Sequence, residues 1–335
     1  MPSLGSFHRD KGTTRSEGMS LPGRCRFVLL FALGVIAVCW LPVGANSFHN
    51  IFLRGAQRPR QVLNIAHAGA SSLAPQNTLV AGQKALQIGA DLWGVDARLT
   101  KDGGFVLMHD ATLDRTTNVE EVFPQRAPWR VDEFTVSELK LLDAGSWFVA
   151  TDPFDQIESG RVSQADLYSY EGERIPTLKE ALEFVREHDW RIDIEVKTTD
   201  DVSDVVIAQK LVTLVVETGT KARVLVSSFD HQLLAEIKRL DPDIPVAALV
   251  IVAPWDPVSY LEELPADVYA PSPVGFTASL VARLGALGFG VHLWTYNDVN
   301  QLEHFAAVEG VSGIYTDFPQ RLEPILDGLF DPQGN

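Results

Sequence analysis

Titratable side chains stand at the ends of several apolar, β-rich runs of this chain. Imidazoles exchange protons near neutral pH, and carboxylates either exchange protons or bind cations. Two histidines, His67 and His109, fall on separate runs from the carboxylates Asp96 and Glu195, which favours one shared site over unrelated structural roles. In chain order, the residues at these run ends are His67, Asp96, His109, Asp110, Glu195, Lys197, Ser227, Ser228, Trp294, Thr295, Asn297, Thr316 and Asp317.

A structural role is the alternative for each residue taken alone. A lone histidine at a strand end is most often a hydrogen-bonded part of the fold. Glu195 and Lys197 share one strand face with Asp193, because side chains alternate with a period of two. An ion ladder inside the sheet would explain those three residues equally well. Trp294 could serve only packing, and Asp317 only the capping of a turn.

The elements that must position these residues alternate between strand and helix patterns. Eight strand units with short connections predict a parallel sheet closed into a (β/α)8 TIM barrel, with a doubly wound open sheet as the alternative. In such a barrel the chemistry lies at the C-terminal ends of the strands. The expected strands are 62–67, 91–99 with an extension at 105–109, 191–197, 224–227, 246–252, 267–270, 290–294 and 313–316.

One stretch, about 110–175, interrupts this alternation. It is rich in Asp, Pro, Trp and Phe and shows only one clear short helix, at 135–142. It predicts a long insertion or small subdomain after the second strand unit.

The composition limits what the 335-residue chain can bind. Apolar residues make up 46% and charged residues 21%, which suits a sizeable core and argues against global disorder. With 28 Lys and Arg against 44 Asp and Glu, the net charge is −16. Because phosphate contacts need cations, we expect no nucleic-acid partner. A substrate that carries phosphate would need a local cation, and a bound metal is the usual one.

The first 45 residues differ from the rest in charge. Their formal net charge is +3, which leaves −19 for residues 46–335. The uncharged apolar run 27–43 follows Arg24 and Arg26 and ends beside small residues. This pattern predicts a signal peptide or membrane anchor over 1–45, with Met19 as a candidate true start. A buried core helix is the alternative.

The location of the body follows from this pattern. The positive-inside rule predicts an exported domain over 46–335, periplasmic or extracellular, held at the membrane by 27–43 if that segment is not cleaved. Both cysteines, Cys25 and Cys39, precede the body, which therefore has neither a disulfide framework nor a catalytic thiol.

Short stretches along the body resemble, in order, the motifs of the glycerophosphodiester phosphodiesterase family, TIM-barrel phosphodiesterases like phosphatidylinositol-specific phospholipase C. The similarity extends over about 64–325 and implies the (β/α)8 barrel, with 110–175 as the family's insertion. The matching stretches are 67–69, 75–78, 89–91, 100–103, 109–110, 114–117, 175–178, 194–197, 294–297 and 316–319.

The resemblance implies a reaction and its parts. The family cleaves a glycerophosphodiester to glycerol 3-phosphate and an alcohol, with a divalent cation, here Mg²⁺ or Ca²⁺. His67 and His109 match the catalytic acid–base pair, and Asp96 and Glu195 match metal carboxylates. Hard oxygen ligands suit these ions, and a cation lowers the charge of the diester. The expected substrate is a small glycerophosphodiester or a lysophospholipid-type diester.

The sequence departs from the family at three motif positions. Ala68 replaces an arginine, Gln76 replaces a glutamate, and Gly94 replaces a glutamate that binds metal. Each change weakens the binding of either the cation or the phosphate.

Other residues could compensate. Gln76 could offer its carbonyl oxygen to the metal, and Arg98, Arg115 or Lys197 could contact the phosphate, with Trp294 beside the substrate. The first hypothesis is therefore a metal-dependent phosphodiesterase with a weakened metal site. The second is an impaired barrel that binds a phosphate ester or a partner without turnover. A third keeps the fold but cleaves another phospholipid diester through a cyclic phosphate.

Overall fold

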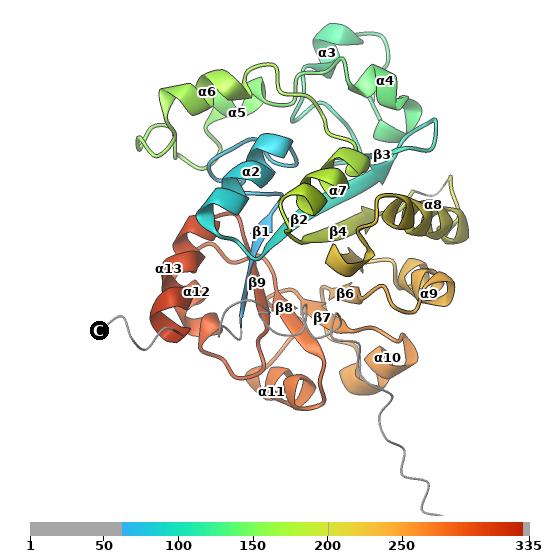
Figure 1. Ribbon diagram of the computed structural model, residues 1–335, viewed down its shortest axis with the longest axis vertical. Coiled ribbons are helices and arrows are strands. Elements are labelled where there is room, and N and C mark those ends of the chain that lie inside the picture. The colour runs from blue at the N-terminus through green and yellow to red at the C-terminus, as the bar shows by residue number, and fades with distance from the viewer. Residues whose placement is uncertain (1–61, 200, 331–335) are drawn as a thin grey trace, which may run out of the picture. The chain divides into compact units, whose positions relative to one another are not determined.

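The computed structural model describes residues 62–199 and 201–330 (Figure 1). Within them one sheet closes on itself, because β1 pairs with both β2 and β9. This confirms the predicted (β/α)8 barrel and excludes the open sheet. The eight parallel strands are β1 (Leu63–His67), β2 (Leu92–Leu99), β4 (Ile192–Lys197), β5 (Val224–Ser228), β6 (Val246–Val250), β7 (Val268–Pro271), β8 (Gly290–Leu293) and β9 (Gly313–Thr316).

A short strand, β3 (Phe105–Leu107), extends the second unit. It runs antiparallel to β2, and the turn between them has Gly103 at φ +80°, a backbone conformation that favours glycine. The chain then reaches His109 directly after β3, so this histidine stands beside the end of β2 without belonging to a barrel strand.

Helices surround the strands, as Figure 1 shows. Their starts follow from capping residues: the Thr78 hydroxyl accepts the N–H of Ala81 at the start of α2, and Thr177 with Glu180 forms a capping box at α7. The helices that follow the strand units are α2 (Leu79–Ile88), α7 (Leu178–Glu187), α8 (Asp204–Glu217), α9 (His231–Leu240), α10 (Pro257–Glu263), α11 (Ala278–Ala286), α12 (Val299–Ala306) and α13 (Pro319–Phe330).

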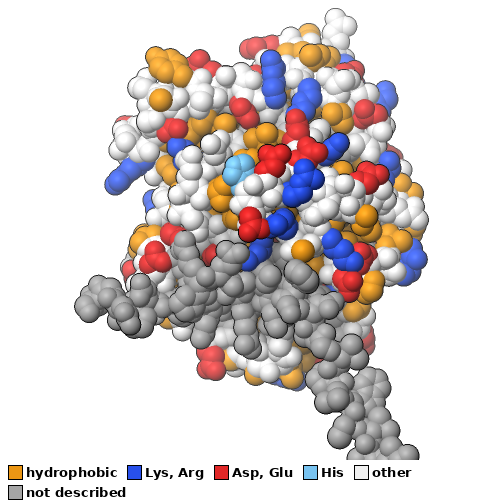
Figure 2. Space-filling model, in the orientation of Figure 1, with side chains coloured by type: hydrophobic (Ala, Val, Ile, Leu, Met, Phe, Trp, Pro, Cys, Tyr) orange, Lys and Arg blue, Asp and Glu red, His pale blue; other side chains and the backbone are white. Residues whose placement is uncertain are grey.

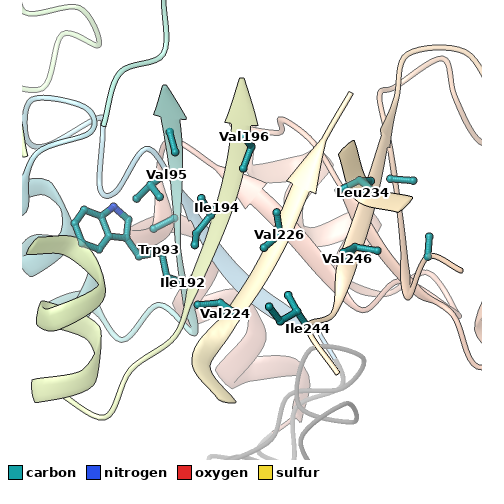
Figure 3. Packing of buried hydrophobic residues seen from close by; sticks show 14 of the residues in the cluster. Trp93, Val95, Ile192, Ile194, Val196, Val224, Val226, Leu234, Ile244 and Val246 are labelled. Atoms are coloured by element: carbon teal, nitrogen blue, oxygen red, sulfur yellow. The ribbon is translucent and has the colours of Figure 1, made fainter. Parts of the chain in front are cut away.

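The alternation of side chains along β4 divides the core into two layers. Ile192, Ile194 and Val196 point outward, where they pack with their neighbours in the layer between strands and helices (Figure 3). The side chains of Asp193 and Glu195 point to the barrel interior, where both line a cavity. Strand-end polar residues therefore face the barrel axis because the apolar residues between them are held by the helices.

The segment for which an insertion was expected, about 110–175, contains short helices that pack in two apolar clusters separate from the main core cluster. Leu113, Phe134 and Leu139 are fully buried in one cluster, and Phe148 and Tyr170 in another. The helices are α3 (Val119–Val122), η1 (Val131–Glu133), α4 (Val136–Leu139), α5 (Ser146–Thr151) and α6 (Gln164–Tyr170).

The segment for which a signal peptide or anchor was predicted, 1–45, lies outside the described residues. Across 62–199 and 201–330, no helix is long and apolar enough to cross a membrane.

Candidate active site

A cavity of about 190 Å³ opens where the barrel strands end. It brings together six of the residues predicted from the sequence: His67, Asp96, His109, Glu195, Lys197 and Trp294. Figure 2 shows a histidine at the surface, with acidic side chains on one side of it and basic side chains beyond them. The remaining lining residues are Ala68, Gly94, Val95, Asp193, Ser227, Phe229, Leu249, Thr295 and Tyr315.

His67, the last residue of β1, is held by a carboxylate from the far end of the chain. Its Nδ1 lies 2.8 Å from Asp317 Oδ1. Ser71 donates to the same oxygen at 3.0 Å, and Asn297 donates to Asp317 Oδ2 at 2.7 Å. Because Nδ1 is engaged, Nε2 is the ring nitrogen left to exchange a proton with a ligand. The role of Asp317 was not predicted, since a turn cap explained it equally well.

The same pair sets the protonation state of His67. Burial disfavours the imidazolium, but the hydrogen bond to Asp317 and the negative charges of Asp317, Asp96 and Glu195 outweigh it and raise the pKa of His67 to about 9. His67 is therefore protonated at neutral pH.

His109 is held in a matching way. Its Nδ1 lies 2.7 Å from Asp110 Oδ1, and Arg115 Nε donates to Asp110 Oδ2 at 2.5 Å. Arg98 fixes the backbone, because its Nε and Nη2 both donate to the carbonyl oxygen of His109, at 3.1 and 2.8 Å. Each catalytic candidate thus presents Nε2, with a carboxylate behind Nδ1. This positioning role of Arg98 was missed, because the sequence offered Arg98 only as a phosphate contact.

Asp96 and Glu195 lie side by side on β2 and β4 as register partners. Lys197 bridges them: its Nζ is 3.0 Å from Asp96 Oδ1 and also contacts Glu195. Asn77 Nδ2 donates a hydrogen bond to Asp96 Oδ2 at 2.8 Å. Burial opposes ionisation, but Lys197, the histidines and Asn77 lower the pKa of Asp96 to about 2, while burial and Asp96 raise the pKa of Glu195.

Asp193 lies one layer deeper, opposite Gly94. Tyr315 and Ser227 donate to its Oδ2 at 2.6 and 3.1 Å, whereas its buried Oδ1 has no hydrogen-bond partner among the described residues. Burial, together with the charges of Glu195 and Asp96, raises the pKa of Asp193 to about 7.

Comparison with known proteins shows which family the chain belongs to. The family model of the glycerophosphoryl diester phosphodiesterases matches residues 67–321. The chain belongs to this family. A Caldanaerobacter subterraneus glycerophosphodiester phosphodiesterase is 34% identical over 271 residues, 78% of this chain and 96% of that protein. A Bacillus subtilis enzyme of the same name is 28% identical over 315 residues, 90% of this chain and 98% of that protein.

Solved structures of the family have the same fold. A Silicibacter pomeroyi structure has a TM-score of 0.73 at 25% identity and covers 84% of this chain and 98% of its own. An Oleispira antarctica phosphodiesterase, solved with the product sn-glycerol-3-phosphate, has a TM-score of 0.65 at 27% identity and covers 78% and 96%. These comparisons confirm the predicted family and its enzyme class.

Two predicted site residues, Gln76 and Arg115, lie outside the lining of the cavity. Gln76 Oε1 is 3.5 Å from Arg115 Nη1, on the exposed side. The Arg115 guanidinium pairs with Asp110 and lies 6.0 Å from the Trp147 ring. Arg115 is linked to His109 through Asp110, and among the described residues Gln76 is linked only to Arg115.

The other departures lie in the cavity wall. Ala68 is buried and has a positive φ of 54°, and Gly94 leaves space on β2 where a Cβ would meet the Ala66 carbonyl oxygen at 3.3 Å. Trp294 forms the opposite, apolar wall. It packs edge-on against Phe229 with ring centroids 5.5 Å apart, and its Nε1 donates to the Ala270 carbonyl at 2.6 Å.

The donors of the site suit the divalent cation that the glycerophosphodiester phosphodiesterases generally use. Asp96, Glu195 and Asp193 bring oxygen atoms to one cavity, and the buried Asp193 Oδ1 lacks a partner. Oxygen ligands of this kind are what Mg²⁺ and Ca²⁺ prefer. In the part of the chain that the structure describes, no three His, Cys, Asp or Glu side chains are placed so that together they could hold a metal ion. Lys197 instead pairs with the carboxylates of Asp96 and Glu195.

Proposed function

We propose that the chain hydrolyses glycerophosphodiesters to glycerol 3-phosphate and an alcohol, with His67 and His109 as the acid–base pair. One observation carries the proposal: two imidazoles line one cavity, and each is held through Nδ1 by a carboxylate. Proton transfer in both directions requires two such groups within reach of one phosphorus centre. The names of the relatives, and the glycerol 3-phosphate bound in the Oleispira structure, support the substrate class.

The charge state of His67 suggests how the pair divides the work. His67 is the imidazolium, because its pKa is raised to about 9, and it donates the proton that the leaving alkoxide needs. His109, the other imidazole that lines the cavity, would then take the proton of the attacking water. One water is consumed, and one alcohol leaves. The assignment predicts that the acid is lost as the pH rises through the pKa of His67.

Asp96 and Glu195 are the proposed metal residues, with the Gln76 carbonyl as the further oxygen predicted from the sequence. A bound cation would lower the charge of the diester and stabilise the pentavalent transition state. The ammonium of Lys197 bridges the same two carboxylates, so it competes with that cation when the site is empty of substrate. Turned to the phosphate, Lys197 would supply the positive charge that Ala68 does not.

The test is hydrolysis of glycerophosphocholine by the purified chain, with Mg²⁺, Ca²⁺ or Mn²⁺ and after chelation. We expect turnover that falls at least about 100-fold in His109→Asn, since a positioned acid or base contributes about 10²- to 10⁴-fold. His304→Asn, an exposed histidine on α12, is the matched control and keeps full activity. Absence of turnover with all three metals would favour the barrel that only binds a phosphate ester.

We propose also that the body is exported to the periplasm or the extracellular space, either cleaved after about residue 45 or anchored by 27–43. The basic flank and the uncharged run support this. Sequencing the N-terminus of the mature chain, after fractionation of cells, tests it. An intact N-terminus in the soluble cytoplasmic fraction would contradict it.

A further inference from the structure

Large apolar side chains protrude from three neighbouring loops at the mouth of the active site. The loops follow β5, β6 and β7, which are adjacent in the barrel, at the same strand ends where the cavity opens. On the surface of a water-soluble protein, exposed apolar residues are usually isolated, and a contiguous group of them marks a contact site. Their exposed fractions are 46% for Phe229, 60% for Ile251, 71% for Val252, 103% for Trp255 and 72% for Val274.

This apolar rim is continuous with the wall of the active site. Leu249 lines the cavity at the end of β6, and Ile251 follows two residues later. The loops after β6 and β7 are joined, because Ser272 Oγ donates to the Ile251 carbonyl at 2.7 Å. Phe229 contributes to both regions: it packs against Trp294 in the cavity wall, yet is itself half-exposed.

The charges around the rim indicate what it contacts. Residues 246–261 contain one charged side chain, Asp256, and residues 268–282 contain none. Asp256 caps α10 through Ser259. In the third loop, Asp230 follows Phe229 and caps α9, and Arg283, just beyond the second stretch, interacts electrostatically with Asp256. The rim therefore offers no cluster of cations to an anionic surface, and the net charge of −19 on residues 46–335 would repel one. A neutral, zwitterionic surface fits both facts.

The shape of the rim favours a lipid surface over a folded partner. Trp255 stands fully exposed at the tip of its loop, so its ring projects outward. Tryptophan prefers the boundary between lipid and water, because its ring is apolar and its indole N–H is polar. Short apolar loop tips that enter a boundary layer need no complementary pocket opposite them.

We propose that the apolar rim docks on a zwitterionic lipid surface and places the mouth of the active site against it. The proposal names lipid as the source of the diester, and this part of it rests on the proposed function. Docking itself requires no catalysis. The phosphodiester of a lysophospholipid would then reach the cavity with its acyl chain still at the surface.

Quenching of Trp255 fluorescence tests docking without reference to activity. The full chain and its Trp255→Phe variant are mixed with phosphatidylcholine vesicles that carry brominated acyl chains. The difference between the two emission spectra reports Trp255 alone, because the other tryptophans contribute equally to both. Both proteins also carry residues 27–43, so any change in fluorescence that binding by that segment causes cancels in the difference. We expect a difference spectrum that shifts to the blue and is quenched at least about twofold by the brominated lipid.

Two outcomes of that measurement would overturn the proposal. An unshifted, unquenched difference spectrum means that Trp255 stays in water. A difference spectrum that is already blue-shifted without vesicles means that another part of the chain, or a second copy, covers the rim.

Activity provides the second test. In Trp255→Ser, we expect kcat/KM for lysophosphatidylcholine in phosphatidylcholine vesicles to fall about 10-fold, and hydrolysis of soluble glycerophosphocholine to stay unchanged. Leu287→Ser, which alters a half-exposed residue at the end of α11, is the control and changes neither. An equal loss on both substrates would contradict docking, because it would place the effect within the active site. If the wild type hydrolyses neither substrate, the proposed function fails, while quenching still decides docking.

Discussion

Lys197 Nζ lies 3.0 Å from Asp96 Oδ1 and also contacts Glu195, so one ammonium bridges the two carboxylates that would hold a metal. All three side chains are largely buried, with 16%, 3% and 19% of their surfaces exposed. A cation bound at this place would therefore compete with the ammonium for the same oxygens.

Replacing Lys197 should make stability depend on divalent ions. Lys197→Met leaves two buried carboxylates without their partner, which costs about 3 kcal/mol in a metal-free buffer. Ca²⁺ or Mg²⁺ should then raise the Tm of the variant by more than it raises that of the wild type. Differential scanning calorimetry with and without the ions measures this. Lys179→Met, which removes an exposed partner of Glu183, is the control, and an equal response in all three proteins would refute competition.

Asp317→Asn should lower the pKa of His67 from about 9 towards the ordinary value of about 6.5, because the hydrogen bond and the negative charge are lost. In the wild type, the stability that this pair provides is fully present below about pH 6.5 and is lost as pH rises through about 9. Titration of the His67 ring by NMR, and the alkaline limb of kcat/KM, report the shift.

The control for Asp317 is Asp298→Asn, which alters the cap of α12 but not the histidine. A His67 titration that is the same in Asp317→Asn as in the wild type would show that the carboxylate does not set its charge.

Asp193→Asn should stabilise the protein at pH 8. The folded carboxyl has a pKa of about 7 against an ordinary 3.8, so the wild type loses stability as pH rises from about 4 to about 7. An amide keeps the acceptor for Tyr315 and Ser227 but cannot ionise. We expect a gain of about 2 kcal/mol in the metal-free protein at pH 8, and none at pH 4, since one unit of pKa shift is worth about 1.4 kcal/mol.

Denaturant unfolding at the two pH values measures the effect of Asp193→Asn. A variant that is less stable than the wild type at pH 8 would mean that the ionised carboxylate is favoured in the folded protein.

Gly94→Glu should strengthen cation binding, because it adds a carboxylate beside Asp193 and below Asp96. We expect Ca²⁺ affinity to rise at least about 10-fold, measured by calorimetric titration. The new Cβ meets the Ala66 carbonyl oxygen at 3.3 Å, so a stability loss of about 1 kcal/mol should accompany it. Gly94→Gln has the same size without the charge. If both variants bind Ca²⁺ alike, the carboxylate at this position is not what the site lacks.

The barrel was predictable because its causes are local. Strands such as β4 alternate apolar residues that meet the helices with polar ones that meet the barrel axis, and the helices begin at recognisable caps such as Thr177. The short helices of the 110–175 segment were not predicted, apart from one, since helices of four to seven residues complete too few turns to show an apolar period.

The site was predictable where residues end strands, and less so where its contacts join distant parts of the chain. His67 ends β1, Asp96 lies three residues before the end of β2 and Glu195 two residues before the end of β4, and the three meet in one cavity, as expected. Asp317 lies 250 residues from His67, and only closure of the barrel reveals their pairing. Gln76 and Arg115 were predicted from their positions in motifs. A motif position does not show that these two side chains contact each other outside the cavity lining.

Closure of the barrel also determines when the site can exist. β1 is completed by β9, and the carboxylate that charges His67 follows β9 directly. A ribosome delivers the chain from its N-terminus, so a nascent chain that lacks residue 317 has neither a closed barrel nor a carboxylate to hold His67. A partly made chain therefore lacks the pairing of His67 with Asp317, which can form only when the last strand has been delivered.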